Sequence, residues 1–435
     1  LTAALLVIAS CLASGATYTY NATANGTWST GSNWAGGSAP LSSNTTTLTF
    51  GGATLAASAN ITATNDIAAP PFQLNSLNVT YAGGSNATAT VNLAGNQLDF
   101  RSNGATTPTI VINTSNTFGT IKPTTTIGNN ILLTNNTTLN ATTIANFTGV
   151  ISGAGSLTIT PSGGTTGNAP LTISGLNTYT GNTTITSVGG AYQSAININS
   201  LADAGVASSL GAGDAINVTN ISYIKYIGSG TASTNRTINI TGSYSYLTLL
   251  ANTGTSFTLN GTVNVPVNGS LDVRANTTIN GVVAGLGSVG FSATGGNLTL
   301  TASNTFSGGV KVNEGNLYIS SIADKGINSN VGSDGIVNLG ATTTTGRLVY
   351  TGTGNTTNRT VNLAGATGGA VLDQSGNGTL TFTSNFTATG VGAKTLTLQG
   401  SKAGTGVIQG VIKDSSSGAT SLTKNGTGTW TLSGT

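Results

Sequence analysis

Short runs of alternating apolar and polar residues recur along most of the chain. In segments 156–160, 237–241 and 379–383, Leu, Ile or Phe alternate with Thr, Ser or Asn. A period of two places the apolar side chains on one face, which is typical of a half-buried β-strand. Clusters of Gly, Asn and Ser separate these runs about every 8–12 residues. The best helical candidate is a turn or two near residues 200–207, so the pattern predicts an almost all-β chain.

The chain also repeats itself, which predicts super-repeats of about 127–132 residues. Self-similarity at a fixed spacing is the signature of a repeat architecture. The matching segments are Gly149–Ser156 with Gly281–Ser288, Leu171–Gly181 with Leu298–Gly308, Ser200–Asp203 with Ser321–Asp324, and Thr234–Asn239 with Thr357–Asn362.

These matches divide the sequence into successive units. Residues 17–148 are expected to form an N-terminal cap and the first coils, 149–280 the first super-repeat, and 281–409 the second. Residues 410–435 read as the start of a truncated third copy. That copy stops at Thr435, where the other two continue into Asn-Thr-aromatic.

Short strands with medium-sized apolar residues favour a stacked coil over globular domains. Aromatic residues make up only 6% of the chain, whereas β-sandwiches need large inward hydrophobes in units of ~100 residues. We therefore predict a right-handed parallel β-helix, or β-solenoid, with roughly 20–24 residues per coil and ~4.8 Å per coil. A string of β-sandwich domains is the alternative.

The first residues are typical of an export signal. Residues 1–12 are apolar but too short for a membrane span of ~20 residues, and small residues follow, including Ser14 and Ala16. We predict a signal peptide over 1–16, cleaved before Thr17. The segment around Cys11 also resembles a lipoprotein cleavage box, and a retained strand is a third interpretation. Neither an initiator Met nor a basic region precedes the run, so the sequence is expected to begin inside the reading frame. No other stretch is a transmembrane candidate.

Composition excludes several kinds of chemistry. The chain has no His, which excludes Ser-His-Asp and Cys-His mechanisms and imidazole metal sites. Its single Cys excludes internal disulfides, Cys-rich zinc sites and iron–sulfur clusters. Charged residues are 5% of the chain, and the net charge of +3 is scattered. Without a basic patch, nucleic acid is not an expected partner. No cofactor is predicted.

The segment Leu422–Gly434 (LTKNGTGTWTLSG) resembles the autotransporter-associated β-strand repeat of bacterial passenger domains. The usual continuation of that repeat, Asn-Thr-Tyr-Thr-Gly, stands at Asn177–Gly181. Gly26–Gly37 (GTWSTGSNWAGG) resembles the mature N-terminus of large secreted proteins that carry such repeats. The resemblance implies a parallel β-helix, export, and surface display or release. It implies no particular activity, because passengers include adhesins, proteases and esterases. The membrane barrel of a complete autotransporter would lie beyond Thr435 or be absent.

Two acid–base pairs carry the enzymatic alternative. Asp99 and Arg101, like Asp272 and Arg274, stand two residues apart and would share one face of a strand. Some β-helix polysaccharide lyases use an Arg or Lys base beside calcium-binding acids, which requires several convergent carboxylates. Only ten acids are spread over this chain. Exposed ion pairs are therefore the favoured interpretation.

Two Gly-containing motifs have simpler explanations than ligand binding. Gly285–Gly290 fits G-x-G-x-x-G, but a strand and turn follow it where a phosphate site needs a helix. Asp203 and Asp324 recur at matching positions, each followed two residues later by Gly. A turn or helix-terminus role is predicted for both, because Asp and Gly suit turns.

The aromatic residues allow two interpretations. Trp28, Trp34 and Trp430 could stack on glycans, but Trp28 and Trp34 are expected to cap the N-terminal end of the solenoid. Tyr179 and Phe306 recur in the repeats and are expected to pack at a corner between coils.

The two ends of the chain suggest a route to self-assembly. The segment containing Thr17, Tyr18 and Tyr20 resembles the Asn-Thr-Tyr-Thr continuation missing after Leu432 to Thr435. One molecule's start could therefore complete the last coil of the next, giving a head-to-tail filament.

Together these features predict a non-enzymatic extracellular β-solenoid, secreted and displayed on a bacterial cell surface. It would serve as a passenger-type stalk, an adhesin or a self-associating fibre subunit. Its expected partners are itself or surface glycans. The alternatives are a carbohydrate-binding surface protein and a polysaccharide lyase or hydrolase built on the same β-helix.

Overall fold

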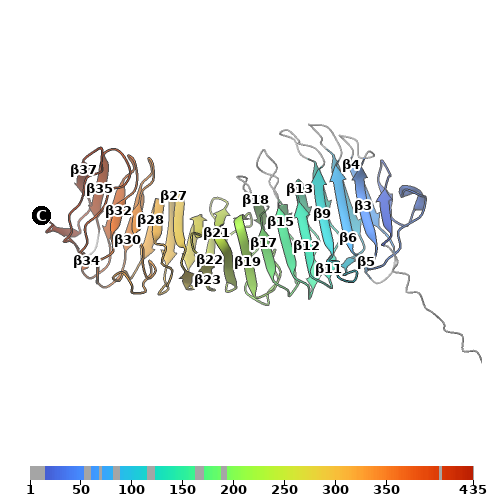
Figure 1. The fold of residues 1–435 in the computed structure, drawn as a ribbon, viewed down its shortest axis with the longest axis horizontal. Coiled ribbons are helices and arrows are strands. Elements are labelled where there is room, and N and C mark those ends of the chain that lie inside the picture. The colour runs from blue at the N-terminus through green and yellow to red at the C-terminus, as the bar shows by residue number, and fades with distance from the viewer. Residues whose placement is uncertain are drawn as a thin grey trace, which may run out of the picture.

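The structure is a computed structural model, and it describes residues 15–52, 60–67, 71–81, 89–114, 123–161, 171–187, 194–400 and 404–434. Strands dominate these ranges, and the helical structure within them is a single 3-10 turn, η1 (Gly31–Asn33). Figure 1 shows the strands side by side along an elongated rod, from the blue N-terminal end to the red C-terminal end. Most of the predicted signal peptide, including Cys11, lies outside the described residues.

The strands of the N-terminal half are β1 (Thr17–Tyr20), β2 (Gly26–Thr27), β3 (Thr47–Gly52), β4 (Asn60–Asn65), β5 (Phe72–Leu74), β6 (Ser76–Tyr81), β7 (Thr90–Gly95), β8 (Leu98–Phe100), β9 (Thr109–Thr114), β10 (Thr124–Ile127), β11 (Ile131–Leu133), β12 (Thr137–Ala141), β13 (Ile144–Phe147), β14 (Ile151–Gly153), β15 (Leu157–Pro161), β16 (Leu171–Ile173), β17 (Thr183–Thr186), β18 (Ser194–Ile198) and β19 (Ala215–Tyr226).

The strands of the C-terminal half are β20 (Thr231–Thr234), β21 (Thr237–Ala251), β22 (Ser256–Leu259), β23 (Val263–Val265), β24 (Ser270–Arg274), β25 (Asn276–Ile279), β26 (Val283–Gly285), β27 (Ser288–Leu300), β28 (Val310–Ile319), β29 (Val337–Leu339), β30 (Gly346–Tyr350), β31 (Asn355–Thr357), β32 (Val361–Leu363), β33 (Ala370–Gln374), β34 (Leu380–Phe382), β35 (Lys394–Gln399), β36 (Thr405–Ile408), β37 (Thr420–Lys424) and β38 (Thr429–Leu432).

Successive coils stack through parallel pairing. β1 pairs with β3, β3 with β6 and β6 with β9, each in parallel register, and the same pattern continues to β35 and β37. Within the described ranges, the strands form one 30-stranded sheet and two four-stranded sheets. Sandwich domains would instead show antiparallel hairpins and Greek keys. The predicted parallel β-solenoid is confirmed, and the sandwich alternative is wrong.

An aliphatic ladder runs along the inside of the rod. Its members meet in register from one coil to the next: Leu48, Leu77, Ile110, Leu139, Ile159, Ile185, Val218 and Ile240. All of them are buried. Each such side chain contributes roughly 1.5–3 kcal/mol on burial. No strand buries its apolar face by itself, so the core is shared along the stack.

Coil length varies more than the sequence suggested. Thr137 pairs with Leu157, 20 residues further along the chain, whereas Thr183 pairs with Ile216, 33 residues further along, because loop 199–214 belongs to that coil. The predicted 20–24 residues per coil is therefore too narrow, since loops of different lengths join the strands. Residues 200–207 lie in this loop as turns, not as the suggested helical turns.

Parallel strand pairing crosses the three predicted boundaries between the repeat units. β13 pairs with β16 across the first, β25 with β27 across the second, and β35 with β37 across the third. The repeats are thus units of sequence within one continuous core. Within the described ranges, no helix has the length and hydropathy needed to cross a membrane.

Candidate functional site

The first acid–base pair is built into the wall of the solenoid. Asp99 lies on β8 with a fully buried side chain, and it accepts a hydrogen bond from Arg101 Nε at 2.6 Å. Thr134 Oγ1 donates to its other oxygen at 2.6 Å. The Arg101 side chain is 41% exposed. The predicted exposed ion pair is therefore wrong for Asp99, because strand stacking covers the carboxylate and both of its oxygens hold a bond.

The second pair does not form. Asp272 on β24 accepts a hydrogen bond from Ser270 Oγ at 2.9 Å, while Arg274 is exposed at the end of the strand. The described part of the chain contains no ion pair between Asp272 and Arg274, so this predicted pair is also wrong. It also contains no group of three or more acidic or Cys side chains that could hold a metal ion. The convergent carboxylates that calcium-dependent lyase chemistry requires are not assembled there.

The first coils enclose an aromatic cluster. Trp28 and Trp34 are 0% and 1% exposed, and their ring centroids lie 6.0 Å apart at nearly right angles. Trp28 also packs edge-on against Phe72, and Trp34 against Tyr20. Trp34 Nε1 donates to the Trp28 carbonyl at 2.9 Å. Buried rings offer no face to a sugar, so this packing fits a cap and not glycan stacking at Trp28 and Trp34.

The outer edge of β1 is already occupied. Ala35 N donates to the Thr19 carbonyl at 2.8 Å, and Asn21 N donates to the Asn33 carbonyl at 2.9 Å. Tyr20 and Trp34 form the antiparallel bridge between these segments. Thr17 and Tyr18 pair on the opposite edge with β3. Head-to-tail pairing through β1 would therefore require residues 33–35 to detach.

At the other end, Trp430 of β38 is held against the preceding coil. Its Nε1 donates to the Gln399 carbonyl at 2.9 Å, and its ring lies over Gly406, where an added Cβ would come within 2.4 Å of the ring. Leu422 and Leu432 are 47% and 45% exposed on β37 and β38. Thr435 lies outside the described residues.

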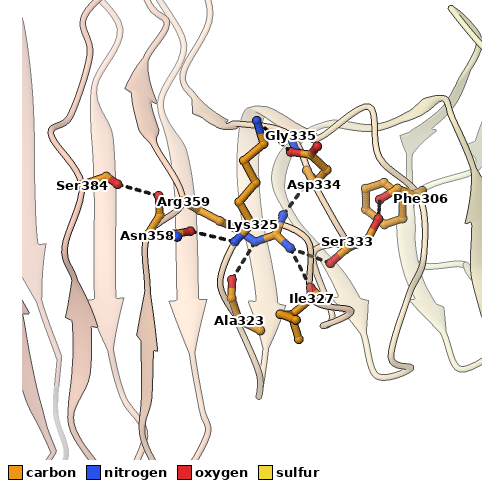
Figure 2. Close-up of polar contacts among 11 residues, drawn as sticks. Phe306, Ala323, Lys325, Ile327, Ser333, Asp334, Gly335, Asn358, Arg359 and Ser384 are labelled. Atoms are coloured by element: carbon orange, nitrogen blue, oxygen red, sulfur yellow. Dashed lines mark hydrogen bonds and ion pairs between the residues drawn. The ribbon is translucent and has the colours of Figure 1, made fainter.

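A buried arginine organises the loop of residues 320–335. Arg359 is 1% exposed, and its guanidinium donates only to main-chain carbonyls (Figure 2). Nε bonds to Ala323 at 2.8 Å and Nη1 to Asp334 at 2.8 Å. Nη2 bonds to Ile327 at 3.1 Å and to Gly332 at 2.8 Å. Burial lowers the pKa of Arg359, and the nearby Asp334 and Asp324 act in the opposite direction.

The same loop is tied to the next coil by a reciprocal pair of bonds. Asn358 N donates to Asp324 Oδ1 at 2.7 Å, and Lys325 N donates to Asn358 Oδ1 at 2.7 Å. Ser384 Oγ extends the chain of contacts by donating to the Asn358 carbonyl at 2.6 Å (Figure 2). Lys325 Nζ lies 3.5 Å from Asp334 at the surface. We call this arrangement, centred on Arg359, the second arginine clamp.

The first arginine clamp repeats it one super-repeat earlier. Arg236 is 1% exposed and donates from Nη1 to the Leu210 carbonyl at 2.9 Å. Asn235 N donates to Asp203 Oδ1 at 2.6 Å, and Ala204 N donates to Asn235 Oδ1 at 2.9 Å. Asp203 and Asp324 therefore act in turns, with Gly two residues on at positive φ in both.

Both clamps have a structural role. The sequence analysis predicted the turn roles of Asp203 and Asp324 but not the buried arginines that these turns surround. The available signal was the recurring triplet Thr-Asn-Arg at Thr234–Arg236 and Thr357–Arg359, in a chain with only 13 basic residues. Both guanidinium groups are buried and donate to main-chain carbonyls, so neither arginine is placed to act on a substrate.

The repeat landmarks Tyr179 and Phe306 are both fully buried, in agreement with packing between coils. Asn177, beside Tyr179, accepts from Ile151 N at 2.7 Å and donates to the Ser209 carbonyl at 2.8 Å. Asn304 makes the equivalent pair of bonds, from Val283 N and to Asn330, both at 2.7 Å. Burial raises the pKa of Tyr179 to about 12.

The G-x-G-x-x-G match carries no phosphate site. Gly285 ends β26 and Ser288 begins β27, so no helix follows to direct N–H groups at a phosphate. The turn interpretation holds at this position.

Comparison with known proteins relates part of the chain to one protein class. No family model matches the chain, and no solved structure matches it. A curated protein that does match is the Adhesin BmaC autotransporter of Brucella suis biovar 1 (strain 1330), 35% identical over 162 residues. The match covers 35% of this chain and 5% of that protein, so the chain spans a small fraction of its relative's length. The type of repeat stays a prediction. The matched part of this β-solenoid is related in sequence to an autotransporter adhesin.

Proposed function

We propose that this chain is the β-solenoid part of a non-enzymatic adhesive protein of the autotransporter passenger type, displayed outside a bacterial cell. The observation that carries the proposal is the uninterrupted parallel ladder, in a chain whose sequence is related to an autotransporter adhesin. A rod of this kind projects a binding surface away from its anchor.

The outer face supports the same function. Polar side chains bond to their counterparts along the rod: Asn239 Nδ2 donates to Asn217 Oδ1 at 3.0 Å, and Asn264 Nδ2 donates to Asn239 Oδ1 at 2.8 Å. Such ladders satisfy polar groups between coils and order the surface. With charged residues at 5% of the chain, the face suits repeated weak contacts better than a reaction centre.

An adhesion assay tests the proposal. Beads coated with the purified chain should bind epithelial cells well above albumin-coated beads. The matched control is Ile159→Asp, which places a charge in the aliphatic ladder and is expected to unfold the stack while leaving the outer residues unchanged in sequence. Adhesion no better than albumin, or equal adhesion by the control, would overturn the proposal.

Two further measurements address the alternatives. Incubation with polygalacturonate and calcium should release no unsaturated uronate; a release abolished by Arg101→Ala would favour the lyase. Electron microscopy should show single rods. Filaments that persist after deletion of residues 17–21 would exclude β1 as the contact between molecules.

A further inference from the structure

A groove of about 340 Å³ lies on the outer surface across four neighbouring strand segments. Tyr244 and Tyr246 of β21 line one side, and Lys311 of β28 lies at the other. Tyr246 is in register with Ser270, and Ser270 with Ser288, so these positions follow one another along the rod. The glycines Gly269, Gly287 and Gly308 also line the groove and leave it open.

Tyr244 is in a backbone conformation that tyrosine rarely adopts. Its φ is +63°, and its side chain is 65% exposed. Asn268 is its equivalent one coil further on, because Tyr246 pairs with Ser270 and each residue stands two positions before that pair. Asn268 has a φ of +57°. Asn tolerates the left-handed region, whereas a bulky residue there costs about 1–3 kcal/mol. Core packing does not explain the tyrosine, because its ring faces solvent.

Lys311 brings an unneutralised positive charge to this groove. The residue is exposed, and its ammonium group makes no hydrogen bond or ion pair with the described residues. Asp272 lies two strands away in the same register row and is bonded to Ser270. Glu314, on the same strand as Lys311, accepts a hydrogen bond from Thr294.

The strands around the groove are already paired on both sides. β24 pairs with β21 and β27, and β27 pairs with β24 and β28. A peptide that added itself as a strand would find no free edge here. The groove instead presents aromatic rings, an amide, a hydroxyl and an ammonium group.

We propose that this groove binds a short unit of an oligosaccharide that carries a carboxylate. A sugar ring would pack on Tyr244 and Tyr246, its hydroxyls would bond to Asn268 and Ser288, and the carboxylate would pair with Lys311. The volume is within the ~300–1,000 Å³ typical of small-ligand sites. This inference rests on the proposed adhesive function and names the ligand class for it.

A glycan array bearing sialylated, uronate-containing and neutral glycans tests the inference on the full chain. Wild type should bind carboxylate-bearing glycans in preference to neutral ones. Lys311→Ala should weaken binding to the best acidic glycan about tenfold, and to its carboxyl-reduced form hardly at all. Tyr244→Asn should lose binding about tenfold or more while remaining folded, since Asn suits a positive φ.

The matched control is Tyr318→Ala. Tyr318 is also an outer tyrosine, but it lies on β28 and does not line this groove. This variant should bind glycans as wild type does. Absence of acidic-glycan binding, preference for neutral glycans, or equal losses in all three variants would overturn the inference.

The array and the bead assay separate the two proposals. If beads adhere equally well with Tyr244→Asn and Lys311→Ala, the groove proposal fails and adhesion stands. If wild-type beads do not adhere while the array detects groove-dependent binding, the adhesive function fails and the groove stands. If the chain binds no glycan and the two groove variants lose adhesion only to protein-coated surfaces, the ligand of the groove is a protein and the saccharide proposal fails.

Discussion

The two arginine clamps occupy equivalent positions but are satisfied to different degrees. Arg359 uses Nε, Nη1 and Nη2 in four bonds to main-chain carbonyls. Arg236 uses Nη1 and Nη2 only, and its buried Nε has no hydrogen-bond partner among the described residues. A buried donor without a partner costs about 1–3 kcal/mol, so the same residue stabilises its two loops unequally.

The neighbours of the clamps differ in the same direction. Asn330 accepts from Ser320 N and Ser321 N, both at 2.8 Å, and also donates to the Ala302 carbonyl at 2.9 Å. At the matching place, Ser209 Oγ accepts from Asn199 N and Ser200 N, both at 3.1 Å. Both groups accept hydrogen bonds, but an amide supplies two N–H donors and a hydroxyl supplies only one. The repeated sequence therefore determines which residues hold each loop, and the side chains around the arginine determine how stable that loop is.

Substitution of each arginine should give the largest difference in stability between the two clamp loops. Arg359→Met should lower the free energy of opening loop 320–335 by about 3–4 kcal/mol, and Arg236→Met should lower that of loop 199–214 by about 1–2 kcal/mol. The smaller loss follows because Met also removes the unpaired Nε. Native-state hydrogen exchange at Lys325 N and Ala204 N measures both. Equal losses of protection would contradict the comparison.

The two super-repeats should also differ in their stability at alkaline pH, because Tyr179 of the first can ionise and Phe306 of the second cannot. Burial raises the pKa of Tyr179 to about 12, against about 10 in the unfolded chain. Between these values the unfolded state releases a proton that the folded state keeps, so stability falls as pH rises from 10 to 12. The contribution of Tyr179 to this loss should approach about 2–3 kcal/mol, at ~1.36 kcal/mol per pKa unit.

Tyr179→Phe should remove that loss and make the first copy resemble the second. Urea unfolding at pH 8 and pH 11.5 measures the change. The total alkaline loss should be smaller in the variant than in wild type, but part of it should remain, since burial also raises the pKa of Tyr81 to about 12. An unchanged pH dependence would show that Tyr179 does not titrate between folded and unfolded states as inferred.

The aspartates should produce the smallest difference. Asp203→Ala and Asp324→Ala each remove an acceptor for a main-chain N–H of the next coil. Each should cost about 0.5–1.5 kcal/mol of local stability, read from exchange at Asn235 N and Asn358 N. The loss should be greater at Asp324, whose negative charge also favours the buried Arg359 cation. A greater loss at Asp203 would reverse this part of the comparison.

The sequence by itself determined the strands, the solenoid and the repeated landmarks. Alternation such as that in β34 (Leu380–Phe382) is local, and a period of two directs every second side chain inward whatever the neighbouring coil contains. Repetition then predicted stacking, because identical units bury their faces against one another. The turn roles of Asp203 and Asp324 followed from local chemistry in the same way.

Only the tertiary structure decided which side chains meet across coils. Asp99 is buried and bonded to Thr134, and Tyr244 shares a groove with Lys311, although neither pair is close in sequence. Such neighbours depend on the length of each coil, which the alternating pattern does not encode. The fold followed from local periodicity alone. The candidate site depended on which residues the lengths of all the intervening coils bring into register on the surface.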